Sequence, residues 1–308
     1  MQIRKKSSKP SAPSIYIKQM FAIEGGQTLL EIFFESEKEA HLFYTWLNSM
    51  KEKAGVLIRQ GQTMSVQIVL PADEKALVRF LVPAVADYIA GNMEDALIVS
   101  IMGTQFYFTD EDEQQQILSI AHSIMEGERT EIPNLRGFSD KKACIEEALL
   151  DFIKPDLKFS FKSFILFRLQ NYLQRLKNYV EAAIEEYKLE QEYQSFIQLL
   201  RDYLHQKHAV MPEIHVFHRR HFLLFNEDYS ELTDSELRRM TDRELLYHHP
   251  VYIDTALLAP LVSIAPKRIC VYSDDPDHGM IQTIQNVFQE RVILHPEVSF
   301  YLNSKKIP

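Results

Sequence analysis

The sequence contains few of the residues that catalytic and metal-binding signatures require. Only two cysteines, Cys144 and Cys270, occur in 308 residues, with no CxxC pair and no histidine at zinc-finger spacing. We expect each to pack as a small apolar residue in a reduced compartment. Only nine glycines occur, and the motifs GxGxxG, GxxxxGK(S/T) and GxSxG are absent. The sequence therefore does not indicate a phosphate-loop enzyme or a nucleophile-elbow hydrolase.

An excess of positive charge and a long apolar run are also absent. The chain carries 34 basic and 43 acidic residues, for a net charge of −9, which disfavours nucleic-acid binding by the surface as a whole. No stretch approaches the roughly 18 apolar residues that a membrane-spanning helix needs. The basic N-terminal stretch is not followed by an apolar segment of secretory length. These observations predict a protein without a membrane span, located in the cytoplasm.

The composition, 46% hydrophobic and 25% charged, is that of an ordinary soluble protein. The pattern predicts an α+β fold with an N-terminal α/β part, a central long helix or helical hairpin, and a small C-terminal sheet with helices. Glycine, proline and asparagine between residues 127 and 137 mark the best internal boundary. The predicted parts are a disordered basic tail (1–18), an α/β domain (19–127), a helical segment (138–208) and an α/β domain (212–303).

Local signals predict the elements of the first part. LLEIFF (29–34) is typical of a buried strand, and Ser36 opens a capping box before a helix. Two β-rich runs flank Gly61-Gln62, which predicts a hairpin with a two-residue turn. A further helix is predicted to be capped by Asp73 and to end near Gly91, with a kink or division at Pro83. Helices are also predicted over 92–102 and 111–126, the second with acidic capping residues at 110–113, and residues 105–109 between them are predicted as a short strand or a buried linker. A last helix is predicted from 139 to about 154.

The block from Phe161 to Leu204 contains no glycine or proline, and its apolar residues recur at helical spacing. A pattern of that length needs a partner surface along it. One continuous helix would be long for a compact domain. We therefore favour a bend or break. The polar cluster 188–192 could sit on a bend but contains no helix-breaking residue, and we leave open whether the block is one helix or two.

The last part predicts a β-β-α-β-α-β order with the helices on one face of the sheet. IHVFH and HFLLF form a hairpin around Arg219-Arg220. Capping boxes begin at Thr233 and Thr241. A helix over 252–264 with a kink at Pro260, a strand over 268–273, a helix over 279–289 and a strand over 291–295 complete the order.

Histidines gather at 205, 208, 215, 218 and 221. Strand alternation places His215 and His218 on opposite faces, while His218 and His221 could pair across the hairpin. A metal site needs several such groups to converge. We favour the interpretation that these are exposed polar residues at a helix end and a hairpin tip, and predict no metal centre and no cofactor.

The acidic loop Asp274, Asp275 and Asp277 lies between a strand and a helix, where α/β folds place ligands. A divalent cation or another ligand could bind there, although one of these residues is expected to cap the helix. Within the helical block, Arg168, Tyr172 and Arg201 combine charge and aromatic surface, as interface anchors do. We regard them as candidate partner-binding residues.

Four segments carry a resemblance to a known family: FxxFRLQNYL (164–173), EEYKLEQEYQSFIQLL (185–200), SIAPKRI (263–269) and FQERVIL (288–294). They are similar to patterns of the YtxC-like family, which is associated with sporulation in endospore-forming bacteria. The resemblance covers about the last half of the chain. It implies a role in sporulation and supplies no catalytic residue.

The leading functional hypothesis is a non-enzymatic interaction or regulatory factor of sporulation that binds a protein partner through the helical block. One alternative is a metal- or ligand-binding enzyme that uses the 274–277 loop. Another is nucleic-acid binding through a local basic face around Lys267, Arg268 and Arg291.

Overall fold

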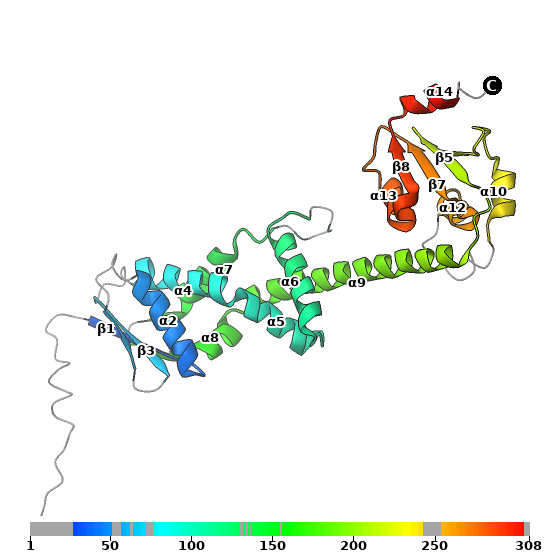
Figure 1. The fold of residues 1–308 in the computed structure, drawn as a ribbon. Helices are drawn as coiled ribbons and strands as arrows, with labels where there is room; N and C mark the ends of the chain where they lie inside the picture. Colours follow the sequence, from blue (N-terminus) through cyan, green and yellow to red (C-terminus); the bar gives the residue numbers. More distant parts are fainter. Residues whose placement is uncertain are drawn as a thin grey trace, which may run out of the picture. The chain divides into compact units, whose positions relative to one another are not determined.

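The computed structural model describes residues 27–50, 57–61, 64–71, 77–129, 132, 135, 137–154, 156–242 and 254–304. Within them it has two four-stranded sheets and many helices, which confirms the predicted α+β class (Figure 1). The chain forms two compact units, Met1–Tyr187 and Lys188–Pro308, here called the N-terminal and C-terminal units. The predicted tail lies outside the described residues. The sequence-based division into a tail, two α/β domains and a helical segment describes independently folding parts, and it stays a prediction.

The N-terminal sheet has the strand order β2-β3-β1-β4. Its strands are β1 (Gln27–Phe33), β2 (Leu57–Gln60), β3 (Ser65–Pro71) and β4 (Lys158–Ser160). The predicted β2–β3 hairpin is confirmed, but its last pair is Gln60 with Val66, so the connection is longer than the predicted two-residue turn. The three-residue strand β4 was not predicted, because it depends on parallel pairing with β1 and carries little local signal.

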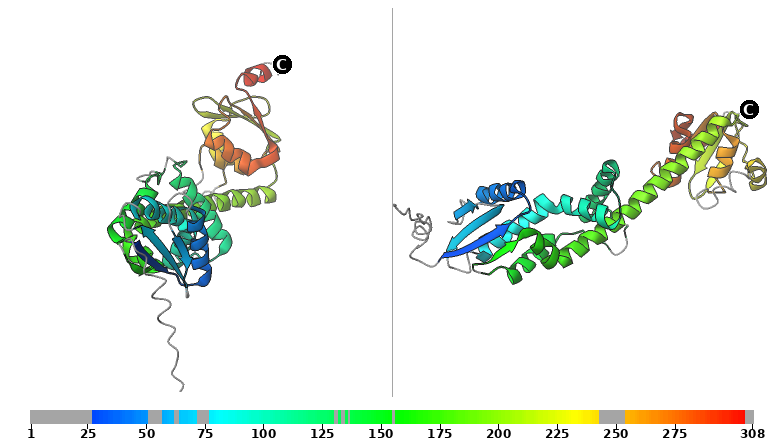
Figure 2. Two further views of the ribbon diagram at one scale, coloured as in Figure 1. Left: turned by 90° about the vertical axis from the view of Figure 1, so that its left-hand side faces the viewer. Right: turned by 90° about the horizontal axis from the view of Figure 1, so that it is seen from below.

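Helix α2 (Glu37–Met50) lies next to β2 and β3 (Figures 1 and 2). Ser36 starts it as predicted, since the Ser36 hydroxyl accepts a hydrogen bond from the Glu39 N–H. Ala40, Phe43 and Leu47 form its buried stripe, at the spacing of one helix face. The edge of the Tyr88 ring meets the Phe43 ring at a centroid distance of 4.9 Å, which joins α2 to the next helices.

A helical run continues from residue 77 to 105 through η2 (Leu77–Leu81), α4 (Val82–Tyr88), η3 (Ile89–Met93) and α5 (Glu94–Gln105). Pro83 stands in the first turn of α4, where its missing N–H is tolerated; the run changes there from π-helix to α-helix without a non-helical residue, so Pro83 does not divide it, and the alternative, a kink, stays a prediction. The predicted end near Gly91 is wrong, because the chain passes Gly91 in a wide π-helical turn. Asp73 lies outside the described residues.

Residues 106–109 do not form the short strand that we suggested, and the alternative, a buried linker, holds in part, because Phe106 and Phe108 are partly buried against the core. Helix α5 ends at Gln105, and the Tyr107 side chain is 82% exposed. Asp110 then caps α6 (Glu111–Met125) by accepting a hydrogen bond from the Glu113 N–H, which confirms the capping interpretation of the acidic run. Helix α7 (Lys141–Phe152) follows a connection that is held by a hydrogen bond from the Phe138 N–H to the Met125 carbonyl.

The helical block consists of α8 (Phe161–Arg168) and α9 (Gln170–Gln206), with the break at Leu169. The predicted break therefore exists, but not at 188–192, where α9 continues. That cluster is polar without containing a helix-breaking residue, and Lys, Leu, Glu and Gln all favour helix. Helix α9 has 37 residues and is about 55 Å long at 1.5 Å per residue.

A buried carboxylate joins three helices of the N-terminal unit. The Glu94 side chain is only 8% exposed, and its two oxygens accept hydrogen bonds from the Lys141 ammonium (2.7 Å) and the Tyr172 hydroxyl (3.0 Å). Burial raises the pKa of Tyr172, so its hydroxyl keeps the proton that it donates. Helices α5, α7 and α9 are thus connected by one satisfied polar group.

Tyr172→Phe tests this connection. The change keeps the ring and removes one hydrogen bond to a buried carboxylate, so we expect it to lower the free energy of unfolding by about 1–3 kcal/mol. Tyr107→Phe, at a side chain that is 82% exposed, is the control and leaves stability unchanged. Urea unfolding followed by circular dichroism measures both. Equal stability of the Tyr172 variant and the wild type would contradict the assignment.

The C-terminal sheet has the order β6-β5-β7-β8, with β5–β6 antiparallel and the other two pairs parallel. The strands are β5 (Glu213–His218), β6 (Phe222–Phe225), β7 (Arg268–Tyr272) and β8 (Val292–His295). The helices are α10 (Asp234–Met240), α12 (Leu258–Ile264), α13 (Gly279–Phe288), the 3-10 turn η4 (Gln289–Arg291) and α14 (Val298–Ser304). The predicted hairpin and the β-β-α-β-α-β order are confirmed.

The two faces of this sheet differ. One face packs Val216 and Val271 against α12, α13 and the end of α9. The other face carries an aromatic cluster in which Phe217 and Tyr272 pack on Phe300 of α14. The prediction that all helices lie on one face is therefore wrong, because the sequence analysis did not find the short helix α14.

Two further helix predictions can be compared with the structure. The capping box at Thr233 is confirmed, with reciprocal hydrogen bonds to Glu236, while the one at Thr241 extends outside the described residues. Helix α12 begins at Leu258 rather than at 252. Pro260 lies in its first turn, where no N–H is needed, so the expected kink is absent.

Candidate functional site on the C-terminal sheet

The acidic loop follows β7 at the carboxyl end of the parallel strands, as predicted. Asp274, Asp275 and Asp277 are all exposed. The Asp274 carboxylate accepts a hydrogen bond from the Glu297 N–H (3.0 Å). The prediction that one of the three caps α13 is wrong, because His278 is the N-cap and its Nδ1 accepts from the Met280 N–H. As ligand-binding residues the three aspartates stay a prediction.

Beside this loop the structure brings together His218 and Ser273, with 2.9 Å between Nδ1 and Oγ. The serine hydroxyl also bonds the backbone N–H and carbonyl of Asp275, at 3.0 and 3.3 Å. Among the described residues, no carboxylate hydrogen-bonds the other ring nitrogen of His218. A nucleophilic pair needs a free hydroxyl and a histidine oriented by a third group. The arrangement therefore stabilises the turn and does not form a catalytic triad.

Two of the five histidines are placed differently from our expectation, while His205, His208 and His221 are exposed as expected. His215 and His218 are buried, at 2% and 8% exposure, rather than exposed. They lie on opposite faces of β5, as alternation predicted. The suggested pairing of His218 with His221 is wrong, because the strand register sets His218 opposite Phe222 and the two rings stack.

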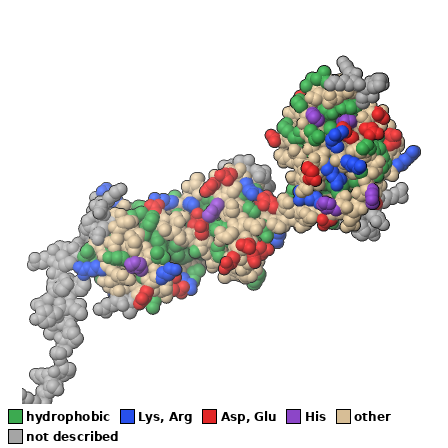
Figure 3. Space-filling model, viewed as in Figure 1, with side chains coloured by type: hydrophobic (Ala, Val, Ile, Leu, Met, Phe, Trp, Pro, Cys, Tyr) green, Lys and Arg blue, Asp and Glu red, His purple; other side chains and the backbone are tan. Residues whose placement is uncertain are grey.

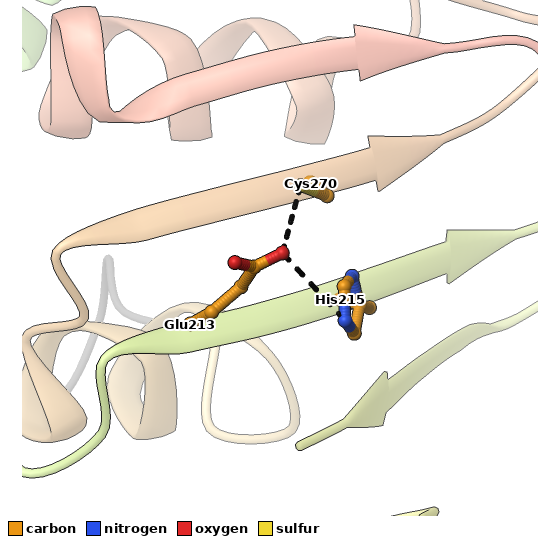
Figure 4. A group of neighbouring side chains, drawn as sticks. All are labelled: Glu213, His215 and Cys270. Carbon is orange, nitrogen blue, oxygen red and sulfur yellow. Dashed lines mark hydrogen bonds and ion pairs between the residues drawn. The ribbon is translucent and has the colours of Figure 1, made fainter. Parts of the chain in front are cut away.

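A second group of polar side chains lies on the aromatic face of the sheet (Figure 4). Parallel pairing sets His215 of β5 opposite Cys270 of β7, and Glu213 opposite Arg268. The Cys270 Sγ lies 3.4 Å from Glu213 Oε1, and His215 Nε2 lies 3.7 Å from the same oxygen. Glu213, His215 and Cys270 are here called the GHC (Glu-His-Cys) cluster. Their ligand atoms all lie within 4.8 Å of one another, close enough to bind one metal ion.

Burial and charge set the protonation states in this cluster. Burial lowers the pKa of His215, so its imidazole is neutral. Burial also raises the pKa of the Cys270 thiol to about 11, with the Glu213 carboxylate as a further cause. Burial is the largest single influence on the pKa of Glu213 and raises it, but the hydrogen bonds from Arg268 and Cys270 and the charge of Arg268 together outweigh burial, so the net shift is downward. Arg268 contacts Glu213 Oε2 and leaves Oε1 directed at the other two side chains.

The predicted partner-binding residues occupy three different environments. Arg168 is exposed at the end of α8, with its guanidinium 5.3 Å from the centre of the Phe152 ring. Tyr172 is fully buried and bonded to Glu94. Arg201 donates from Nε and Nη2 to the Asn286 carbonyl, at 2.9 and 2.6 Å. This carbonyl lies in the last turn of α13, so Arg201 caps that helix.

The C-terminal unit has a small groove along α9, here called the α9 groove. Its volume is about 180 Å³. Its apolar lining comes from Leu189, Tyr193, Phe196, Leu258 and Met280, and Glu192, Asp254 and Thr283 complete it. Small-molecule sites usually measure about 300–1,000 Å³. The groove therefore fits one side chain of a partner better than it fits a cofactor.

One of the three residues of the suggested basic face is paired with a carboxylate, and a second is hydrogen-bonded to a backbone carbonyl. Arg268 is paired with Glu213, and Arg291 donates to the Pro266 carbonyl. Acidic and basic side chains are interspersed on the face shown in Figure 3. Nucleic-acid binding by the suggested basic face stays an alternative hypothesis, and the expectation that such binding is not favoured stays a prediction.

Comparison with known proteins extends the resemblance seen in the sequence. The family model described as "YtxC-like family" matches residues 79–293, which is more than half of the chain. The chain belongs to the YtxC-like family. A protein of Bacillus subtilis (strain 168) named "Uncharacterized protein YtxC" is 38% identical over 277 residues, covering 88% of this chain and 96% of that protein. No solved structure matches the chain.

The match to the YtxC-like family begins earlier than the sequence segments suggested. It extends from residue 79, inside η2, and includes both the GHC cluster and the α9 groove. None of the helices that the structure describes is long and apolar enough to cross a bilayer.

The buried histidines predict how the stability of this YtxC-like protein depends on pH. Burial lowers the pKa of both His215 and His218 below the ordinary value of 6.5. Below that pH the unfolded chain binds more protons than the folded chain, so stability is complete above about pH 6.5 and falls as the pH decreases. We expect a lower melting temperature at about pH 5.5 than at about pH 7.5, measured with chelator present.

His218→Gln removes one of the two groups and should reduce this difference in melting temperature. His205→Gln, at an exposed position near the end of α9, should keep the wild-type difference. An unchanged pH dependence in the His218 variant would contradict this account.

Proposed function

We propose that this chain is a non-enzymatic protein-interaction or regulatory factor that acts in sporulation, in the cytoplasm, and binds its partner through the C-terminal half of α9. The resemblance to the YtxC-like family supports the cellular role. The α9 groove is the observation that carries the proposed activity, because it is an apolar recess on the helical block for which a partner surface was predicted.

The groove favours one kind of partner. Leu189 is 58% exposed and Tyr193 is 37% exposed, and both line the groove. An exposed leucine and tyrosine beside a recess are typical of residues that hold a partner side chain. The acidic residues of the lining, Glu192 and Asp254, add negative charge. We infer a protein segment that inserts an apolar side chain and carries Lys or Arg beside it.

The wall of the groove is held in place by contacts between α9 and α13. The Tyr193 hydroxyl lies 3.4 Å from the Thr283 hydroxyl and accepts from the Asn286 side-chain amide at 3.1 Å. Arg201 bonds the Asn286 carbonyl two turns further along α9. These contacts fix the spacing of the two helices, so the recess exists before a partner binds and little ordering is required. In this proposal Arg201 positions the groove and does not contact the partner.

Site-specific photo-crosslinking in cells tests the proposal. A photoreactive amino acid at position 189 should give one dominant crosslinked protein in sporulating cells and none in growing cells. The same amino acid at position 150 of α7, where the leucine is 49% exposed, is the matched control and should not capture that protein.

Binding between purified proteins then decides whether the groove is responsible. We expect Leu189→Glu to weaken the affinity for the captured partner at least tenfold, which is about 1.4 kcal/mol of binding free energy. The change places a carboxylate in a recess whose lining is apolar and acidic. Leu150→Glu should leave the affinity unchanged. Equal affinity of the Leu189 variant and the wild type would show that the partner binds elsewhere.

A further inference from the structure

The GHC cluster presents three different metal-ligand atoms to one point. Cys270 supplies a sulfur, His215 an imidazole nitrogen and Glu213 a carboxylate oxygen. They come from neighbouring parallel strands, which are rigid elements and position side chains better than loops do. The cluster lies on the aromatic face of the sheet, is not part of the α9 groove, and was not predicted from the sequence.

The burial and the missing hydrogen bond of His215 independently indicate that a ligand binds there. Its side chain is 3% exposed, and Nε2 has no hydrogen-bond partner among the atoms of the residues that the structure describes. The ring is fixed by stacking on Tyr229, with 4.0 Å between centroids, and Nδ1 faces the Tyr272 hydroxyl at 3.4 Å. A metal-binding histidine is oriented in this way, with one nitrogen held by a neighbour and the other left for the ion.

Two of the three ligand–ligand separations are close to those of tetrahedral coordination. Ligand bonds of about 2.0–2.3 Å to zinc place neighbouring ligand atoms about 3.3–3.6 Å apart. The observed separations are 3.4 Å from Cys270 Sγ to Glu213 Oε1 and 3.7 Å from His215 Nε2 to the same oxygen. The ligand atoms of Cys270 and His215 lie within 4.8 Å of each other, so a side-chain shift of about 1 Å would bring all three ligand atoms to bonding distance of one ion.

We propose that Glu213, His215 and Cys270 form a binding site for a single divalent transition-metal ion, with Zn²⁺ as the best fit. One thiolate, one imidazole and one carboxylate are ligands that Zn²⁺ accepts together, whereas Mg²⁺ and Ca²⁺ prefer oxygen alone. Three protein ligands leave the fourth tetrahedral position for water or another small ligand.

The neighbouring residues shape the site. Arg268 holds Glu213 Oε2, which directs Oε1 inward and makes the carboxylate a ligand through one oxygen. The Tyr272 hydroxyl, which faces His215 Nδ1, is itself held 3.0 Å from the Tyr229 hydroxyl. Neutral imidazole is the form that binds a metal, and the raised pKa of Cys270 means that the ion displaces the thiol proton.

Metal titration of the purified full-length chain tests this proposal. After treatment with a chelator, Zn²⁺ should bind at one equivalent per chain. Co²⁺ should bind in its place and give the intense near-ultraviolet absorption of a cobalt–thiolate bond. Cys270→Ser and His215→Gln should each weaken Zn²⁺ binding by more than tenfold and, in the Cys270 variant, abolish that absorption.

Matched controls use the same residue types elsewhere. Cys144→Ser removes the other cysteine, which is in the N-terminal unit, and His205→Gln removes an exposed histidine. Both variants should bind Zn²⁺ as the wild type does. Equal Zn²⁺ affinity in the Cys270 variant, or the absence of stoichiometric binding by the wild type, would overturn the proposal.

A measurement on the unaltered chain tests the site without depending on how the variants fold. Zn²⁺ should slow the alkylation of Cys270 at least tenfold and leave the rate at Cys144 unchanged, with the two sites distinguished by mass spectrometry of peptides. Protection of neither cysteine, or of both equally, would contradict a site at Cys270.

Discussion

The parallel pairing of β5 with β7 is the constraint on which the C-terminal unit depends. Its register sets Ile214 opposite Ile269 and Val216 opposite Val271, so one face of both strands is apolar and is buried against helices. The same register necessarily sets His215 opposite Cys270 on the other face. A shift by one residue would expose the apolar set and separate the polar one. The burial of the core and the arrangement of the GHC cluster thus have a single cause.

Local sequence signals predicted most helices and strands of this chain. They failed where contacts between residues distant in the sequence determine the local structure. The Thr233 capping box, the Asp110 cap and the β5–β6 hairpin are properties of a few neighbouring residues, and the structure confirms them. Gly91 misled the prediction because tertiary packing carries the helical run past it. The cluster 188–192 misled it because polarity alone does not end a helix. Strand β4 and helix α14 are too short to show a period.

The candidate site was harder to predict than the fold. Glu213 and His215 are separated from Cys270 by more than fifty residues in the sequence, and only the pairing of their strands brings them together. A weak signal was present: polar residues occupy alternate positions on both strands, Glu213 and His215 on one, Arg268 and Cys270 on the other. In strands that pack one face on helices, polar residues at alternate positions indicate that polar groups gather on the opposite face of the sheet. The α9 groove, by contrast, needs the packing of three helices and has no counterpart in the sequence.

The position of β8 at the end of the sheet has a consequence for self-association. Among the described residues β8 pairs only with β7, so its other side offers free backbone groups, and Ile293 and Leu294 are 42% and 38% exposed. An apolar edge of this kind can recruit a strand from a second molecule and begin aggregation. The strand has only four residues, and Pro296, which has no N–H, follows it directly. This proline therefore contributes to solubility by keeping the open edge short.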